Sequence, residues 1–364
     1  MPSVLTAPSA SRRAVVLVAL ATTATLALGA CSGPPTEPTP VAPVTQAPVI
    51  EAAKGAPPAP VVPPRWPLTG VTATEVSTRP ALAIKVENST EARPQTGLDQ
   101  ADVIWEQVVE GGISRFVAVY QSQVPAEVGP IRSVRPMDPA IAAPLHGLIA
   151  FSGGQPAFVQ ALKNAGLQTV SMDAGAAGFY RKKGVGPAPH NVYGTPQTFW
   201  DQADADHSAA PPAQFVFAKV LDKATAVASG GPSSTVAVRL SGFSRPSWTW
   251  DAGTGTWLRA EGATPATLRS GARIAATNVV TLKVRLIDSG TVDPAGNPVP
   301  ETVLEGTGEA TISGGGKTVT GTWTKGSRDA VLTLATPDGA VVTLAPGITW
   351  VELVPRDSGS VTIS

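Results

Sequence analysis

The sequence predicts an α+β protein, in which an N-terminal mixed α/β domain containing a long β-hairpin is followed by a C-terminal mostly-β domain. Two runs rich in Val, Ile and aromatic residues, Val103–Val109 and Ile113–Tyr120, are separated by Glu110-Gly111-Gly112, and Gly pairs favour hairpin turns because Gly readily adopts positive φ. After Pro211-Pro212 the pattern changes to short alternating strands alone. The 36 Gly and 36 Pro residues favour many turns over long helices.

The N-terminus has the pattern of a secretory signal. Arg12-Arg13 precede an apolar run that ends at Leu28-Gly29-Ala30-Cys31, a match to the lipobox of bacterial lipoproteins. We therefore expect residues 1–30 to be a signal peptide and Cys31, the only cysteine, to carry a palmitate-type lipid anchor on the outer face of the cell membrane. The alternative is an uncleaved anchor helix, although the run is short for a bilayer span of about 20 residues.

A linker follows the expected lipidated cysteine. Residues 31–64 are dominated by Pro, Ala, Thr and Val with almost no charge, a composition that does not bury a core. At about 3.1 Å per residue, such a chain reaches on the order of 100 Å. We expect a Pro/Ala-rich disordered tether between the membrane and the folded part.

The folded part is expected to divide into an N-terminal domain at residues 65–210 and a C-terminal domain at residues 213–364. In the first, the pattern predicts strands at Ala81–Glu87, Leu148–Phe151 and Leu167–Met172, helices at Pro156–Asn164 and from Pro196 to about Asp206, and a short helix from Asp138-Pro139 toward His146. The turn at Gly153-Gly154 precedes a helix N-terminus, which is either an anion site or only a tight turn.

The second domain contains several alternating runs broken by turn residues, and the only helix expected there is Ala218–Ala228. The runs are STVAVRL, NVVTLKVRLI, KTVTGTWT, AVLTLAT and ITWVELV. Five Trp residues of this half form either a platform for stacking on sugars or, as is more common in β domains, part of the core. They are Trp248, Trp250, Trp257, Trp323 and Trp350.

A two-residue turn at Gly111-Gly112 fixes which side chains share a face of the hairpin. Glu110 would then face Ile113, Val108 would face Arg115, and Glu106 would face Val117. The other face, with Trp105 and Phe116 among its residues, is the more apolar and is expected to face the core. A helix over Asp99–Val109 is the competing interpretation, which the β-branched content disfavours.

Two further segments are rich in polar residues. Arg132 and Arg135 are held between prolines in the segment GPIRSVRP, so two guanidinium groups lie on a stiff loop. The segment APHNVYGT contains His190 and Asn191 and leads into a helix that begins at Pro196.

The EGGISRF turn, the GPIRSVRP loop, the FSGG turn and the APHNVYGT segment together resemble the N-terminal domain of the YerB-like bacterial lipoproteins. The resemblance extends over residues 65 to 364, with the weaker patterns GTWTK and PGITWVELVP in the second half. It implies two domains and supports the architecture rather than any chemistry, because that family has no established biochemical activity.

The sequence offers no strong catalytic or metal motif. G-x-S-x-G, H-E-x-x-H and C-x-x-C patterns are absent, and no two of the three histidines have metal-ligand spacing. The segment from Ser313 to Thr318 looks like a phosphate loop, but strand patterns on both sides predict a hairpin tip. No cofactor is expected. The 27 basic and 27 acidic residues balance, which argues against nucleic acid as a partner.

The candidate ligand-binding residues are therefore the polar set of the N-terminal domain, which comprises Glu110, Arg115, Arg132, Arg135, Arg181, His190 and Asn191. Arg suits a carboxylate or phosphate because its planar fork donates two parallel hydrogen bonds. Equally, these arginines could neutralise Glu106, Glu110 and nearby carboxylates in a structural network. His190 is either a general base or a structural histidine, and no nucleophile accompanies it.

Two functions follow from these residues. The first is a non-catalytic, membrane-anchored binding or scaffolding lipoprotein of the cell envelope, with an Arg-lined groove for an anionic cell-wall component or an envelope protein. The alternative is an envelope hydrolase or transferase that uses His190 and Glu110 with Arg132 and Arg135.

Overall fold

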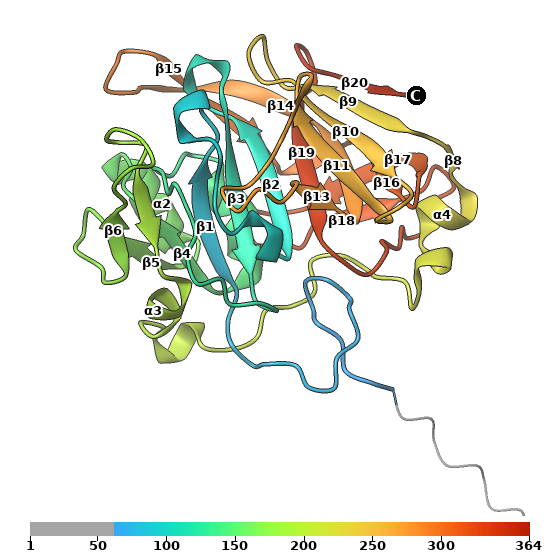
Figure 1. Ribbon diagram of the computed structural model, residues 1–364, viewed down its shortest axis with the longest axis horizontal. Coiled ribbons are helices and arrows are strands. Elements are labelled where there is room, and N and C mark those ends of the chain that lie inside the picture. Colours follow the sequence, from blue (N-terminus) through green and yellow to red (C-terminus); the bar gives the residue numbers. More distant parts are fainter. Residues whose placement is uncertain (1–61) are drawn as a thin grey trace, which may run out of the picture. The chain divides into compact units, whose positions relative to one another are not determined.

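The computed structural model describes residues 62–364, which belong to one compact unit, Pro60–Ser364. The expected signal peptide, Cys31 and almost all of the expected tether lie outside the described residues. Strands dominate the unit, and its helices are few and short (Figure 1). Within the described part of the chain, no helix is both long and apolar enough to cross a bilayer.

Between residues 62 and 210 the chain alternates strands with short helices. The strands are β1 (Leu82–Glu87), β2 (Val103–Val108), β3 (Ser114–Tyr120), β4 (Leu148–Phe151), β5 (Gln168–Ser171), β6 (Phe179–Arg181) and β7 (Val192–Gly194), and the helices are α1 (Asp138–Ala142), α2 (Pro156–Asn164) and α3 (Pro196–Trp200). Most lie where the sequence predicts them. Helix α3 ends earlier than expected because Asp204 caps a separate turn, accepting hydrogen bonds from the backbone of Asp206 and His207.

Residues 211–364 are almost entirely strands. They are β8 (Gly231–Pro232), β9 (Thr235–Arg239), β10 (Pro246–Asp251), β11 (Thr256–Glu261), β12 (Thr264–Pro265), β13 (Ala275–Ala276), β14 (Asn278–Val292), β15 (Pro298–Val303), β16 (Gly306–Gly314), β17 (Lys317–Lys325), β18 (Thr333–Ala335), β19 (Thr349–Pro355) and β20 (Ser360–Ile363). The helix expected at Ala218–Ala228 is reduced to α4 (Thr225–Ser229). The segment that looks like a phosphate loop is the β16–β17 turn, with Gly315 and Gly316 at positive φ.

One large sheet runs through both halves of the chain, with β18-β17-β16-β14-β19-β2-β3-β1-β4-β5 as its main path. The halves join where β19 pairs in parallel with β2, so that Thr349 lies opposite Val103 and Glu352 lies opposite Glu106. Figure 1 shows these two strands side by side near the centre of the molecule. A strand from the end of the chain thus extends a sheet that begins near residue 82.

Each face of the large sheet carries its own core. On one face, α1 and α2 pack with apolar residues of both halves, including Trp105, Phe158 and Leu353. On the other face lies a second sheet with the path β12-β11-β10-β9-β20, and Phe116, Trp248 and Trp350 meet between the two sheets. Burial of this apolar surface supplies most of the driving force for folding.

The predicted register of the β2–β3 pair is wrong by one residue. Gln107 lies opposite Arg115, and Trp105 lies opposite Val117. The connection has three residues instead of two, because the backbone N–H of Val109 bonds to the carbonyl of Ile113 at 2.8 Å, leaving Glu110-Gly111-Gly112 as the loop. A shift of one residue moves side chains to opposite faces, and Glu106 therefore does not share a face with Arg115.

The sequence predicts an N-terminal and a C-terminal domain that meet at Pro211-Pro212, and in the structure these two parts pack together into one compact unit, Pro60–Ser364. The physical reason is the position of β19, which hydrogen-bonds to β14 on one side and to β2 on the other. Since the two cores are also shared between the halves, neither half buries its apolar surface alone.

Candidate functional site

The GPIRSVRP loop is held against the end of β1, which brings three separate segments together. The backbone N–H of Glu87 bonds to the carbonyl of Pro130 at 2.9 Å, and that of Arg132 bonds to the carbonyl of Lys85 at 2.8 Å. The N–H of Ile131 bonds to the carbonyl of Val192 at 2.6 Å, which places the loop beside the segment that contains His190. Backbone hydrogen bonds thus hold the segments GPIRSVRP and APHNVYGT next to each other.

Glu87, which the sequence analysis did not single out, is the acidic centre of this region. Its side chain is buried, and its Oε1 lies 3.0 Å from Nδ1 of His190 and 3.3 Å from Nε of Arg132. The hydroxyl of Ser89 donates to the same oxygen at 3.3 Å. The other oxygen, Oε2, is buried and has no hydrogen-bond partner among the described residues. A signal for Glu87 existed, since Lys85 and Glu87 interrupt an otherwise apolar buried strand.

Arg115 is a buried cation without a direct ionic partner. It is 4% exposed and donates from Nη1 to the carbonyl of Ser133 at 3.1 Å. Its Nε is buried without a hydrogen-bond partner, and within residues 62–364 no carboxylate lies within ion-pair distance of it. Burial, with the nearby charges of Arg135 and Arg132, lowers the pKa of Arg115 to about 9.

Arg135 has a structural partner in Glu110. Its Nε forms an ion pair with the carboxylate of Glu110, and its Nη1 donates to the carbonyl of Val134 at 2.8 Å. Both side chains are largely buried. An arginine that neutralises a nearby carboxylate in a structural network should form such a pair. Arg135 therefore attaches the GPIRSVRP loop to the β2–β3 connection.

A second buried pair fixes the same end of the loop through its backbone. Nζ of Lys85 lies 2.6 Å from Oδ1 of Asp138, and Nε2 of Gln107 donates to the same oxygen at 2.6 Å. Oδ2 of Asp138 accepts the backbone N–H of Arg135 at 2.7 Å. Lys85 and Asp138 are fully buried, and desolvation lowers the pKa of Lys85 to about 8 although the Asp138 carboxylate opposes the shift.

Arg181 and Asn191 form a pair of their own. Nη1 of Arg181 donates to Oδ1 of Asn191 at 2.8 Å, at an exposed position beside the β6–β7 ribbon. Nδ2 of Asn191 donates to the carbonyl of Gly186 at 3.2 Å. The seven candidate residues therefore fall into three groups. In the first, Arg132 and His190 contact the carboxylate of Glu87, and Arg115 lies opposite Glu87 on the next strand. In the second, Arg135 pairs with Glu110, and in the third, Arg181 bonds to Asn191.

A separate charged cluster lies between the two sheets. Nη2 of Arg259 donates to both carboxylate oxygens of Glu106, at 2.9 and 2.8 Å, and Nη1 donates to Glu261. Indole N–H groups complete it, with Trp248 donating to Glu352 at 2.9 Å and Trp350 donating to Glu106 at 3.2 Å. The buried guanidinium of Arg259 thus faces three carboxylates, and the partly exposed Arg93 lies 3.3 Å from one of them, Glu261.

The excess of carboxylates in this cluster shifts their protonation. Burial raises the pKa of Glu352 well above its ordinary value, and the neighbouring charge of Glu106 raises it further. Burial likewise raises the pKa of Glu106, while Arg259 opposes that shift. Glu352 is therefore the member of the cluster whose charged form is most disfavoured.

The tryptophans of the second half belong mainly to the cores. Trp248, Trp257 and Trp350 are fully buried, Trp323 is 2% exposed, and only Trp250 is partly exposed. Their burial favours the packing interpretation over a sugar-stacking platform.

Two family models match the chain. The model described as "Protein of unknown function (DUF3048) N-terminal domain" matches residues 68–209, and the corresponding C-terminal domain model matches residues 236–351. Among proteins of known sequence, "Putative lipoprotein YerB" of Bacillus subtilis (strain 168) is 36% identical over 129 residues. The chain belongs to the YerB-like family. The family resemblance predicted from the sequence is therefore confirmed.

The alignment with the B. subtilis relative covers 35% of this YerB-like chain and 39% of the relative, well under two thirds of its length. The crystal structure of the YerB protein from B. subtilis matches over 82% of this chain and 99% of that chain, with a TM-score of 0.69 and 24% identity. At that identity the structural match shows a shared fold alone. The family models describe two domains of unknown function and assign no chemistry.

Proposed function

We propose that this YerB-like chain is a lipoprotein anchored to the outer face of the cell membrane through Cys31, where it serves as a non-catalytic binding or scaffolding protein of the cell envelope. In this proposal, Arg115 and Arg132 together bind an anionic group, a carboxylate or a phosphate, of an envelope component. The observation that carries it is Arg115, a buried guanidinium with an unpartnered Nε and no carboxylate within ion-pair distance in residues 62–364.

The charge balance supports the same proposal. Four cations, Lys85, Arg115, Arg132 and Arg135, lie around three carboxylates, and each carboxylate has its own ion pair. Arg132 is the accessible member, with 22% of its side chain exposed, and its Nε is within ion-pair distance of Glu87 but is not aligned to donate a hydrogen bond. An anion that binds beside Arg132 and reaches Arg115 would neutralise the one positive charge in excess. It would thereby lower the free-energy cost of burying that charge.

Inorganic phosphate tests this site. Thermal unfolding of the full chain at pH 7 should shift to higher temperature as phosphate is added, beyond the shift in potassium chloride of equal ionic strength, because a ligand that binds the native state stabilises it by mass action. Arg132→Gln and Arg115→Gln should each remove the phosphate-specific shift.

Arg181→Gln is the matched control, since Arg181 is an exposed arginine of the same half whose described partner is Asn191. It should leave the phosphate shift unchanged. An equal shift in all three variants would mean that phosphate acts only as an excluded, stabilising salt, and the proposed site would be withdrawn.

A hydrolase or transferase remains the second candidate because of one contact. The carboxylate of Glu87 lies 3.0 Å from Nδ1 of His190, an arrangement that holds the imidazole and leaves Nε2 as the free nitrogen of a 20% exposed side chain. Glu110, the carboxylate expected to act with His190, is instead paired with Arg135. Turnover of a cell-wall substrate that is lost in His190→Ala, with folding intact, would favour this candidate.

The anchor is tested separately. Cys31→Ser should move the protein from the membrane fraction to the soluble fraction, because stable attachment needs more than one acyl chain and the lipobox cysteine is where the chains would be attached. Fractionation followed by immunodetection measures this. A variant that stays in the membrane fraction at the wild-type level, with its signal peptide removed, would show that the attachment is not through Cys31.

A further inference from the structure

The large sheet splits at β14, and the split leaves a groove on its surface. From Asn278 to Leu282, β14 pairs with β16, but from Arg285 onward it pairs with β15, while β16 continues beside β17 alone. The indole N–H of Trp323 donates to the carbonyl of Lys283 at 2.9 Å in this fork. Gly308 is required there, since a Cβ would lie 2.5 Å from that carbonyl and 2.6 Å from the indole nitrogen.

Two cavities follow the groove along β16 and share Lys283 and Glu309 in their walls. The first has a volume of about 540 Å³ and the second of about 700 Å³. Because they share these two residues, the two cavities are adjacent and follow one another along β16. The length of the groove suits a chain-like ligand more than a single small molecule.

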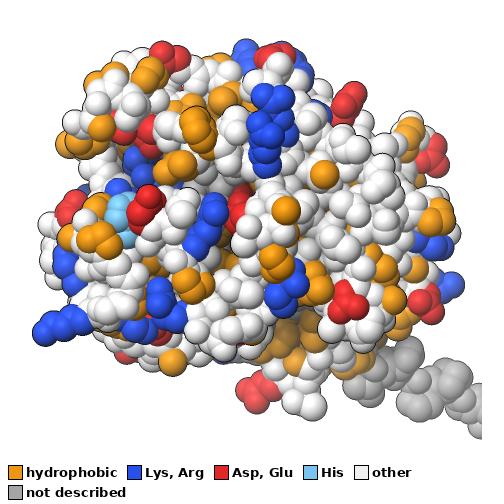
Figure 2. Space-filling model, turned by 45° about the horizontal axis from the view of Figure 1, so that its top comes forward, with side chains coloured by type: hydrophobic (Ala, Val, Ile, Leu, Met, Phe, Trp, Pro, Cys, Tyr) orange, Lys and Arg blue, Asp and Glu red, His pale blue; other side chains and the backbone are white. Residues whose placement is uncertain are grey.

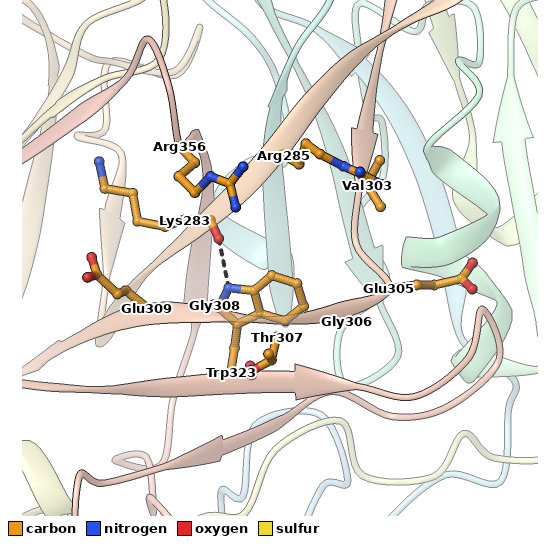
Figure 3. A pocket seen from close by; sticks show the side chains of 10 residues that line it. All are labelled: Lys283, Arg285, Val303, Glu305, Gly306, Thr307, Gly308, Glu309, Trp323 and Arg356. Atoms are coloured by element: carbon orange, nitrogen blue, oxygen red, sulfur yellow. Dashed lines mark hydrogen bonds between the residues drawn. The ribbon is translucent and has the colours of Figure 1, made fainter.

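The first cavity is rich in cations. Figure 3 shows Arg285 and Arg356 on the same side of it, across from the indole of Trp323, with Glu309 and Glu305 at its opposite ends. Arg285 is exposed and has no ion pair within residues 62–364, and Arg356 has only the exposed Asp357 at 3.3 Å. Exposed pairs contribute little to stability, so both guanidiniums are available to a ligand.

The second cavity is lined by hydroxyl groups. Thr311 of β16 lies opposite Thr320 of β17, and the alternation of the strands places Thr318, Thr320 and Thr322 on one face. Val361 and Ile363 of β20 form the apolar wall on the other side. A surface that combines many hydroxyls with one apolar wall is suited to a polyhydroxylated ligand, because hydroxyls both donate and accept hydrogen bonds.

We propose that this groove, defined by Lys283, Arg285, Arg356, Glu309 and the threonines of β16 and β17, binds an acidic oligosaccharide, a chain of sugars that carries carboxylates at intervals. The arginines bind the carboxylates, and the threonines and Glu309 bind sugar hydroxyls. Glu305 and Glu309 would repel a dense polyanion such as polyphosphate, which favours a ligand of lower charge density. This site is independent of the Arg115 site.

The charge pattern of the surface agrees with a local recognition site. Basic and acidic side chains are interspersed on the face shown in Figure 2, with no broad field of one sign. The groove wall likewise carries both signs, with three basic side chains beside Glu305 and Glu309, so binding there would depend on specific contacts instead of on overall attraction to any anion.

Titration calorimetry of the full chain with oligogalacturonate tests the proposal, with maltoheptaose as the neutral sugar, polyphosphate as the dense polyanion and polyglutamate as the acidic peptide. Oligogalacturonate should bind most tightly. Arg285→Gln with Arg356→Gln should weaken its binding by about tenfold or more, since charge-assisted hydrogen bonds are lost. Thr320→Val with Thr322→Val should weaken it also, although the charge is unchanged.

The matched control is Arg239→Gln with Arg245→Gln. Arg239 ends β9 and Arg245 directly precedes β10; both are exposed, do not line the groove and should leave binding unchanged. Absence of oligogalacturonate binding by the wild-type chain would overturn the proposal. So would an equal loss in both arginine pairs, which would show overall charge attraction. Tighter binding of polyphosphate or polyglutamate, lost in the groove variants, would make the groove a site for a different ligand class.

Discussion

Arg259→Met should lower the free energy of unfolding by about 3–5 kcal/mol, because it removes the cation from a buried cluster of carboxylates. Arg259 is 1% exposed, and its guanidinium bonds to both oxygens of Glu106 and to Glu261. It also packs against the rings of Phe116, Trp248 and Trp350. Methionine retains part of that packing, so the predicted loss of stability comes mainly from the buried carboxylates that no longer have a cationic partner. Denaturant unfolding followed by fluorescence measures it.

Two other variants separate this effect from a general sensitivity of the fold. Arg239→Met replaces an exposed arginine of strand β9, which belongs to the same sheet as Arg259 but is separated from β11 by β10, and it should change stability by less than about 0.5 kcal/mol. Glu352→Gln should cost far less than Arg259→Met, because burial already disfavours the charged form of Glu352 and raises its pKa well above the ordinary value, and because Gln keeps an oxygen that can accept the Trp248 N–H. If Glu352→Gln were as damaging as Arg259→Met, Glu352 would be ionised and this account of the cluster would be wrong.

Local sequence patterns were sufficient for most strands, because alternation and β-branched content reflect a pleat that buries one face. They were not sufficient for the register of β2 and β3. Two glycines in succession fit either a two-residue or a three-residue loop, and the choice depends on whether Val109 bonds to Ile113. That one bond decides which face Glu106 occupies, and with it whether Glu106 belongs with Arg115 or with Arg259.

The joining of the two halves had no local signal at all. Strand β19 reads as an ordinary strand of a β domain, and nothing in residues 349–355 indicates that β2 is its neighbour. Pairing between strands so distant in sequence is decided by the packing of whole faces. The change of composition at Pro211-Pro212 therefore predicts the change of element type, but it does not predict the strand pairing that joins both parts in one compact unit.

Part of the candidate site could have been found by looking for charged residues inside strands that are otherwise apolar. Lys85 and Glu87 in β1 and Glu352 in β19 are charged residues in strands that are buried along their whole length, and Arg259 in β11 is a charged residue at a position that alternates in phase with the buried Trp257. A buried charge needs a partner, so each such residue predicts a partner of opposite charge from elsewhere in the chain. Which partner it meets was not predictable, because that depends on the fold.

The second large effect is expected at Asp138. Asp138→Ala should lower the free energy of unfolding by about 3–5 kcal/mol, since it strands the fully buried ammonium group of Lys85. It also removes the acceptor of the Gln107 side chain and of the Arg135 backbone, which fixes the loop that carries Arg132. Denaturant unfolding at pH 7 measures the loss.

The contribution of the Lys85–Asp138 ion pair is distinguished from that of the other Asp138 contacts by combining Lys85→Met with Asp138→Ala. The double variant should be more stable than Asp138→Ala alone, because the uncompensated cation is gone, although Gln107 and the Arg135 backbone still lack their acceptor. Recovery should therefore be partial. A double variant whose loss equals the sum of the two single losses would show that Lys85 and Asp138 are not coupled. The stability of the Arg132 loop would then rest on its backbone hydrogen bonds to β1 and to Val192 instead of on this buried pair.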